Sequence, residues 1–180
     1  EKGELSKDKG DDESLIFSEI YDRCCSGVYS YCLRKLNNDR EMAKDILQEA
    51  FITLYNNLEK GCCVTSLFSY LIGISRNLCL NHFNRRQKNT VSLDSGTDYL
   101  NIENIFEDMG NKIESDELFG IVLKAVQVLP EKQREAYELR EFSGMKYSEI
   151  AEICDLTLSC AKDRVYKAQE KIRKILSPYI

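Results

Sequence analysis

Apolar residues recur every three or four positions through most of the chain, which is the spacing that places them on one face of an α-helix. No segment shows a sustained alternation of apolar and polar residues, the pattern of a half-buried strand. The pattern therefore predicts an all-α protein. Its first helical run consists of Phe17, Ile20, Tyr21, Cys24, Val28 and Tyr31.

Two further helices are predicted in the N-terminal half, with a loop between them. Asp39 is suited to begin the first of these two, because its carboxylate can accept a hydrogen bond from a backbone N–H of the first turn. Residues 59–66, around Gly61, interrupt the apolar pattern and are expected to form the loop, and the next helix should span residues 67–86. The predicted buried faces of the two helices consist of Ala43, Leu47, Ala50, Phe51, Leu54 and Leu58, and of Leu67, Leu71, Ile74 and Leu78.

The apolar pattern returns near residue 118 and predicts a second helical group. Pro130 is placed at the first position of a helix, where its missing N–H costs nothing, and Gly144 ends that helix. A short helix near residues 148–154, a tight turn and a longer helix near 158–176 follow. This is the arrangement of a helix-turn-helix, whose second helix enters the DNA major groove.

The remaining segments are polar and weakly periodic. Residues 1–14 are rich in Lys, Asp, Glu and Gly, and we expect them to form a disordered N-terminal lead. Residues 87–115 should form a flexible acidic linker with a short helical turn near residues 102–109. We thus expect two small helical domains, residues 15–86 and 116–180, joined by that linker.

Charge is distributed unevenly along the chain, whose formal net charge is −5. Residues 76–88 contain four basic residues and no acid, and residues 162–174 contain six basic residues and two acids. Residues 89–120, by contrast, contain one lysine and eight acids. Two basic segments separated by an acidic one indicate two separate contacts with a polyanion.

The cysteines and the single histidine do not suggest a metal site. The eight cysteines include two adjacent pairs but no C-x-x-C spacing, and His82 is the only available imidazole. We interpret the cysteines as reduced, small apolar residues of a cytoplasmic protein. No nucleotide-binding loop, metal cluster or catalytic triad is visible, so we expect neither catalysis nor a cofactor. No apolar run approaches the roughly 20 residues that span a bilayer, and no membrane insertion is expected.

Two segments resemble one bacterial family. The sequence LPEKQREAYELREFSGMKYSEIAEICDLTLSCAKDRVYKAQEKI, residues 129–172, resembles region 4 of sigma factors, and most closely that of the extracytoplasmic-function (ECF) group. The sequences AKDILQEAFITLYNNL and SRNLCLNHFNRRQKN resemble region 2 of the same family. The resemblance covers about residues 15–86 and 116–176. It implies a dissociable subunit that directs core RNA polymerase to specific promoters and helps to melt the −10 element.

The resemblance also implies partners and sites. The partners are core RNA polymerase, through its largest-subunit clamp and its flap, promoter DNA, and an anti-sigma factor or another regulatory protein. The loop of residues 59–66 matches the loop that holds a base flipped from the non-template strand. The implied polymerase-binding residues are Asp45, Gln48, Glu49 and Ile52. The implied −10 DNA-binding residues are Tyr70, Arg76, Asn77, Asn81, Asn84, Arg85, Arg86 and Lys88. The implied −35 DNA-binding residues are Ser159, Cys160, Lys162, Asp163, Arg164 and Lys167.

Two other functions stay open from the residues alone. The chain could be a stand-alone helix-turn-helix transcriptional regulator, or a helical adaptor whose acidic faces bind only protein. Asp163 adds a separate question, because the family usually has a small polar residue there. Its carboxylate can accept a hydrogen bond from cytosine N4, or it can repel DNA phosphates, and we favour repulsion.

Overall fold

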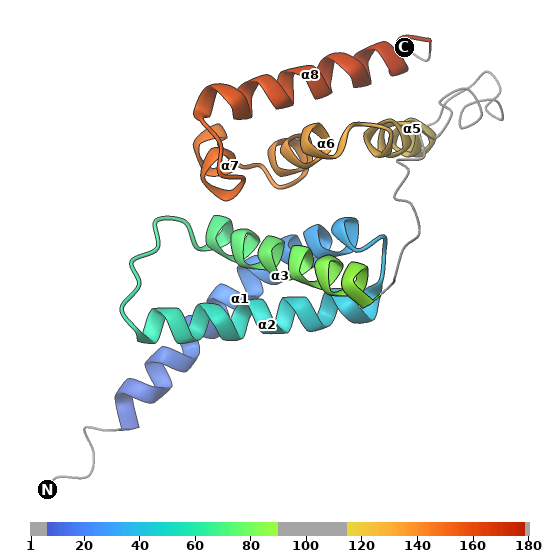
Figure 1. Cartoon of the computed structure of the whole chain (residues 1–180). Helices are drawn as coiled ribbons and strands as arrows, with labels where there is room; N and C mark the ends of the chain where they lie inside the picture. The colour runs from blue at the N-terminus through green and yellow to red at the C-terminus, as the bar shows by residue number, and fades with distance from the viewer. Residues whose placement is uncertain (1–6, 90–114, 179–180) are drawn as a thin grey trace, which may run out of the picture. The chain divides into compact units, whose positions relative to one another are not determined.

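The computed structural model describes residues 7–89 and 115–178 (Figure 1). Side chains are described for residues 15–85 and 120–178. These residues are helical or lie in turns, so the all-α prediction is confirmed for the described part of the chain. They belong to two compact units, which are described here one at a time. Of the expected linker, residues 87–89 and residue 115 belong to helices, so the linker is shorter at both ends than predicted. Residues 90–114, including the helical turn expected near residues 102–109, lie outside the described residues, and the exact domain bounds stay predictions.

The first unit packs three helices against one another: α1 (Lys7–Lys35), α2 (Arg40–Glu59) and α3 (Leu67–Asn89) (Figure 1). Gly27 lies where α1 and α3 approach closely, since a Cβ atom there would be only 2.8 Å from the ring of Phe68. The core between the helices consists of Cys24, Val28, Tyr31, Cys32, Leu36, Ala43, Ile46, Ala50, Phe51, Leu54, Leu71, Ile72 and Cys79.

Helix α1 starts at Lys7, inside the segment that was expected to be a disordered lead. That expectation is wrong for residues 7–14, and residues 1–6 lie outside the described residues. Four acids of this segment, at positions 8, 11, 12 and 13, stand in the first two turns of α1, where the helix dipole favours negative charge. Asn37 and Asn38 then adopt positive φ angles of 52° and 64° and reverse the chain. Asp39 caps α2 as predicted, with its Oδ1 accepting from Met42 N at 3.1 Å.

The buried face of α3 differs from the predicted one. Leu71 is buried as expected, but Ile72, Ser75 and Cys79 join it, while Ile74 is only half-buried. Leu67 and Leu78, also assigned to the buried face, are likewise half-buried. Ser75 can be buried because its hydroxyl donates a hydrogen bond of 2.8 Å to the Leu71 carbonyl. A prediction that places only the most apolar residues inside cannot anticipate such a serine.

The second unit contains α5 (Ser115–Gln127), α6 (Glu131–Tyr137), the π-helical turn η1 (Glu138–Phe142), α7 (Tyr147–Ile153) and α8 (Leu158–Leu176). Helix α8 packs on α5, α6 and α7. Gly144, with φ of +67°, follows the π-helical turn and ends the helical run, as predicted. One core cluster consists of Ile121, Ala125, Val126, Leu129, Ala168, Ile172 and Leu176.

Helices α7 and α8 form the predicted helix-turn-helix. Asp155 takes a positive φ of 53° in the turn, and Leu156 N donates to the Ala151 carbonyl at 2.8 Å. The Thr157 hydroxyl then caps α8 by accepting from Cys160 N at 3.2 Å. The turn is therefore fixed by hydrogen bonds at both helix ends.

Within the described ranges, no helix is both long enough and apolar enough to cross a lipid bilayer. The same residues contain no group of three or more His, Cys, Asp or Glu side chains that could hold a metal ion.

Candidate functional site

One face of α2 points away from the core of the first unit and carries the residues assigned to polymerase binding. Asp45, Gln48, Glu49 and Ile52 are all exposed, and Ile52 has an exposed fraction of 53%. Asp45 and Glu49 take part in no ion pair among the described residues, whereas their neighbours Glu41 and Lys44 pair at 3.2 Å. The structure therefore brings two uncompensated carboxylates and an exposed isoleucine onto one surface.

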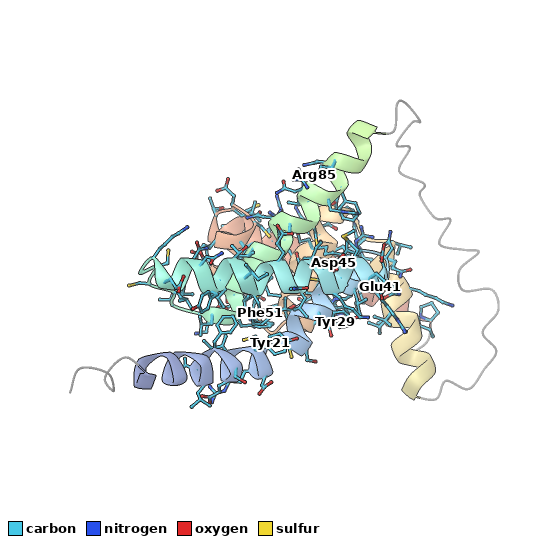
Figure 2. The ribbon with its side chains drawn as sticks, turned by 90° about the horizontal axis from the view of Figure 1, so that it is seen from below. Tyr21, Tyr29, Glu41, Asp45, Phe51 and Arg85 are labelled. Atoms are coloured by element: carbon cyan, nitrogen blue, oxygen red, sulfur yellow. The ribbon has the colours of Figure 1, made fainter. Side chains whose placement is uncertain are left out.

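An aromatic groove between α1 and α2 adjoins this face, and the sequence analysis did not identify it as a site. The ring centres of Tyr21 and Phe51 lie 4.8 Å apart (Figure 2). The ring of Phe17 lies edge-on to that of Tyr55, with 5.4 Å between the ring centres. The hollow has a volume of about 480 Å³. It is lined by Phe17, Tyr21, Lys44, Leu47, Gln48, Phe51, Ile52 and Tyr55, and we call these residues the α1–α2 groove.

A sequence signal for the groove was present in α1. The segment LIF at residues 15–17 is apolar at three consecutive positions, which is more than one helix face can bury. Leu15 and Ile16 are accordingly 69% and 58% exposed. Ile16 lines a second hollow that shares Phe17 and Tyr55 with the groove. The exposed apolar surface of α1 is thus continuous with that of α2.

Along one side of α3, at helical spacing, lie four of the residues assigned to the −10 element: Tyr70, Asn77, Asn81 and Asn84. Asn77, Asn81 and Asn84 are exposed on successive turns, and Arg85 is exposed toward the end of the helix (Figure 2). Tyr70, Gly73 and Arg76 are half-buried. The side chains of Arg86 and Lys88 lie outside the described residues. The structure therefore brings the three asparagines and at least one arginine together on an accessible surface.

The loop between α2 and α3 is held at both ends. Gly61 takes a positive φ of 79°, and Cys62 N donates to the Asn57 carbonyl at 3.0 Å. At the other end, the Ser66 hydroxyl accepts from Ser69 N at 3.3 Å. Asn57 also joins the two helices, because its Nδ2 donates to the Tyr70 hydroxyl at 3.0 Å. The sequence analysis did not single out Asn57, since nothing local indicates a contact 13 residues away.

The outward face of α8 carries the residues assigned to the −35 element. Ser159, Lys162, Asp163 and Lys167 are exposed, and Cys160 and Arg164 are half-buried. Tyr166, which the sequence analysis did not include, is 65% exposed beside them.

The acid at the centre of this face is paired. The Asp163 carboxylate lies 2.8 Å from Lys167 Nζ, and its hydrogen bond and charge raise the pKa of Lys167. Two turns further along, Glu170 and Lys174 form a similar pair at 3.0 Å. Part of the positive charge of α8 is therefore neutralised along the helix itself.

Comparison with known proteins gives two family matches. Residues 20–89 match the Sigma-70 region 2 family, and residues 119–172 match the Sigma-70, region 4 family. The order of the two regions agrees with the resemblance found in the sequence, and so does the helix-turn-helix within the second match.

Curated relatives of similar length carry the same family name. The ECF RNA polymerase sigma-E factor of Escherichia coli K12 is 32% identical over 145 residues, covering 76% of this chain and 74% of the relative. The RNA polymerase sigma-H factor of Pseudomonas aeruginosa is 28% identical over 149 residues, covering 79% and 77%.

A solved structure shares the fold. The sigma factor RpoE from Bartonella quintana, crystallised in complex with the anti-sigma factor NepR, has a TM-score of 0.65. The match covers 89% of this chain and 96% of that one at 19% identity. Two family matches in tandem, with relatives matched over most of their length, lead to one identification. This chain belongs to the ECF group of RNA polymerase sigma factors, which are non-enzymatic, DNA-binding subunits for transcription initiation, and it contains their regions 2 and 4.

Proposed function

We propose that this sigma factor docks on core RNA polymerase through α2 and the α1–α2 groove, and that it uses α3 and α8 on promoter DNA. One observation carries the proposal. Within a single three-helix unit, an acidic and apolar face on α2 coexists with a face of asparagine and arginine on α3. Each helix directs its exposed face away from the shared core, so the two surfaces can bind different partners at once.

The chemistry of α2 supports a protein partner. An acidic rim around exposed apolar residues is typical of a protein interface, in which buried aromatic anchors contribute most of the binding energy. A complementary partner would place basic groups opposite Asp45 and Glu49 and an apolar side chain against Ile52. In sigma factors the matching surface binds the clamp of the largest polymerase subunit, which is the partner we assign to it.

The chemistry of α3 supports contact with separated DNA strands at the −10 element. An asparagine side chain both donates and accepts hydrogen bonds, so a row of them can read base edges that melting exposes. Arg85, together with Arg86 and Lys88 from the sequence, supplies positive charge for phosphates. The loop of residues 59–66 is assigned to hold a flipped base. Extruding that base costs a few kcal/mol of stacking and pairing, which contacts in the loop must offset.

The helix-turn-helix supports contact with the −35 element. We assign Ser159, Cys160, Lys162 and Arg164 to the major groove and its phosphates, with Asp163 and Lys167 acting as a pair. The self-neutralised outward face suggests that region 4 binds DNA weakly alone and relies on polymerase to bring it to the promoter.

Three further assignments complete the proposal. The working domains are residues 15–86 and 116–180. Helix α3 continues the first of them to residue 89 and α5 begins at residue 115, and the acidic segment between these two helices competes with DNA for the basic segments. The protein acts with core polymerase in the cytoplasm. An anti-sigma factor controls it, as suggested by the fold it shares with the Bartonella quintana RpoE that was crystallised with NepR.

Run-off transcription with purified core polymerase tests the proposal. The chain should start transcription on its cognate promoter only when core enzyme is present. A stand-alone helix-turn-helix regulator would bind DNA without core enzyme and would start nothing. A helical adaptor would neither bind DNA nor start transcription.

A further inference from the structure

Asn57 makes two contacts that belong to different parts of the molecule. Its backbone carbonyl accepts from Cys62 N at 3.0 Å and so fixes the start of the loop. Its side-chain Nδ2 donates to the hydroxyl of Tyr70, in the first turn of α3, at 3.0 Å. A single residue therefore sets both the path of the loop and the position of the phenol ring beside it.

The direction of the Asn57–Tyr70 hydrogen bond decides whether the phenol can donate to another partner. An amide nitrogen only donates, so the Tyr70 oxygen must accept, and the phenol proton is left for another partner. No hydrogen bond in the described part of the chain gives that proton an acceptor. Tyr70 is half-buried, so its ring is held by the protein while part of it still reaches solvent.

The neighbours of Tyr70 place this donor in the DNA-binding region. Tyr70 N donates to the Ser66 carbonyl at 3.0 Å, which ties the residue to the end of the loop. Asn77 and Asn81 follow on the same side of α3, two and three turns further along. Along the chain, Tyr70 thus stands between the loop assigned to the flipped base and the asparagines assigned to the −10 strand.

We infer that Tyr70 donates a hydrogen bond to an unpaired −10 nucleotide and that Asn57 is the positioning residue that orients this donor. The inference rests on the proposed function of α3. The acceptor is an oxygen or nitrogen atom with a lone pair, from either a base edge or a backbone phosphate.

Three variants test the inference in holoenzyme assembled with core polymerase. Tyr70→Phe removes only the hydroxyl. Asn57→Asp keeps the size of the side chain but replaces the donor with an acceptor, so the phenol proton turns inward to the carboxylate and is lost to DNA. Tyr29→Phe removes a hydroxyl from half-buried Tyr29 of α1 and serves as the matched control. Thermal unfolding of each free variant checks that the fold is kept.

The measurement is the affinity of each holoenzyme for a fork-junction DNA whose −10 region is single-stranded. Tyr70→Phe and Asn57→Asp should each weaken binding about three- to tenfold, the effect of one lost hydrogen bond, and Tyr29→Phe should not. In a Tyr70→Phe background, Asn57→Asp should add little, because both variants remove the same donor. An equal loss in both backgrounds would mean that the new carboxylate acts by charge alone, and it would overturn the role of Asn57.

Modified probes separate the two sources of the acceptor. If the acceptor is a phosphate, one neutral methylphosphonate linkage should abolish the difference between wild type and Tyr70→Phe. If it is a base edge, substitution at one −10 position should abolish the difference instead.

Asn77→Ala is measured alongside as a reference for α3. Normal binding by Tyr70→Phe with a loss in Asn77→Ala refutes the inference alone, whereas normal binding by both variants refutes the proposed function of α3 and the inference with it.

Discussion

Asp163 and Lys167 form an ion pair of 2.8 Å one turn apart on the outward face of α8. Both residues belong to the proposed −35 surface, and in the free protein they bind each other. A phosphate can bind Lys167 only in competition with this internal carboxylate. Asp163 would therefore weaken DNA binding in two ways. Its own charge repels phosphate, and its ion pair with Lys167 makes that lysine less available to phosphate.

Replacing Asp163 with serine should release Lys167 for phosphate. We expect Asp163→Ser to raise affinity for specific and scrambled duplexes alike, most strongly at low salt. The slope of log K against log salt should become steeper by about 1, the value for one added phosphate contact. Fluorescence anisotropy of the full chain on both duplexes measures this, with Glu170→Ser as the control from the next pair along. A loss confined to the specific duplex would instead make Asp163 a reader of cytosine.

Charge reversal on α2 should impair assembly with polymerase. Asp45→Lys with Glu49→Lys is expected to lower affinity for core enzyme about tenfold or more, because basic groups of the partner would then face like charges. Both side chains are exposed, so the melting temperature should stay near that of wild type. Asp22→Lys, an exposed reversal on α1, is the control. Unchanged binding of a folded double variant to core polymerase would remove α2 from the interface.

The α1–α2 groove should contribute to the same interface. Tyr21 is 43% exposed and packs on Phe51, so Tyr21→Ser removes an aromatic anchor without opening the deep core. We expect a loss of about 1–2 kcal/mol in binding to core polymerase. Leu123→Ser, a 36% exposed apolar position in the second unit, should have no such effect. Equal losses at Tyr21 and Leu123 would indicate a general effect of lost apolar surface.

Separate variants on α3 should distinguish base contacts from phosphate contacts. Asn77→Ala should reduce promoter melting and relax discrimination at one −10 position by about 1–3 kcal/mol. Arg85→Ala should instead weaken binding across sequences and flatten the salt dependence. Potassium permanganate footprinting of open complexes reports the melted thymines. Wild-type melting and specificity in the Asn77 variant would count against its assignment.

Two native thiols can report on the loop without any mutation. Cys62 and Cys63 are exposed, whereas Cys25 of α1 is half-buried and distant in sequence from the loop. In an open complex, DNA over the loop should slow the alkylation of Cys62 and Cys63 by iodoacetamide, while the rate at Cys25 stays unaffected by promoter DNA. Peptide mass spectrometry gives the rate for each cysteine. Unchanged rates at both loop thiols would place DNA elsewhere.

Regular features of the fold could be predicted from sequence because their causes are local. The cap at Asp39, the loop around Gly61 and the end of the helical run at Gly144 each depend on a few neighbouring residues. The exposed residues of α2 and α8 followed from helical periodicity for the same reason. The roles proposed for these surfaces come from the resemblance to sigma factors and stay predictions.

Features that depend on distant contacts could not be predicted in the same way. The burial of Ser75 requires a backbone acceptor and the small neighbours that let α1 and α3 approach. The α1–α2 groove arises only when aromatic residues from two helices meet, and the Asn57–Tyr70 bond spans a loop. The Asp163–Lys167 pair was within reach of sequence reasoning, because i,i+4 spacing favours such pairs. The expectation of simple repulsion by Asp163 leaves this pairing out.

The close approach of α1 to α3 at Gly27 affects how the sequence and promoter choice of such a protein can change in evolution. Any larger residue there would displace the ring of Phe68, which lies two residues before Tyr70 on α3. The placement of α3, the helix proposed to contact the −10 element, therefore depends on a position on α1. A substitution remote from every base could retune promoter choice, so the set of promoters recognised is open to change through packing as well as through contact residues.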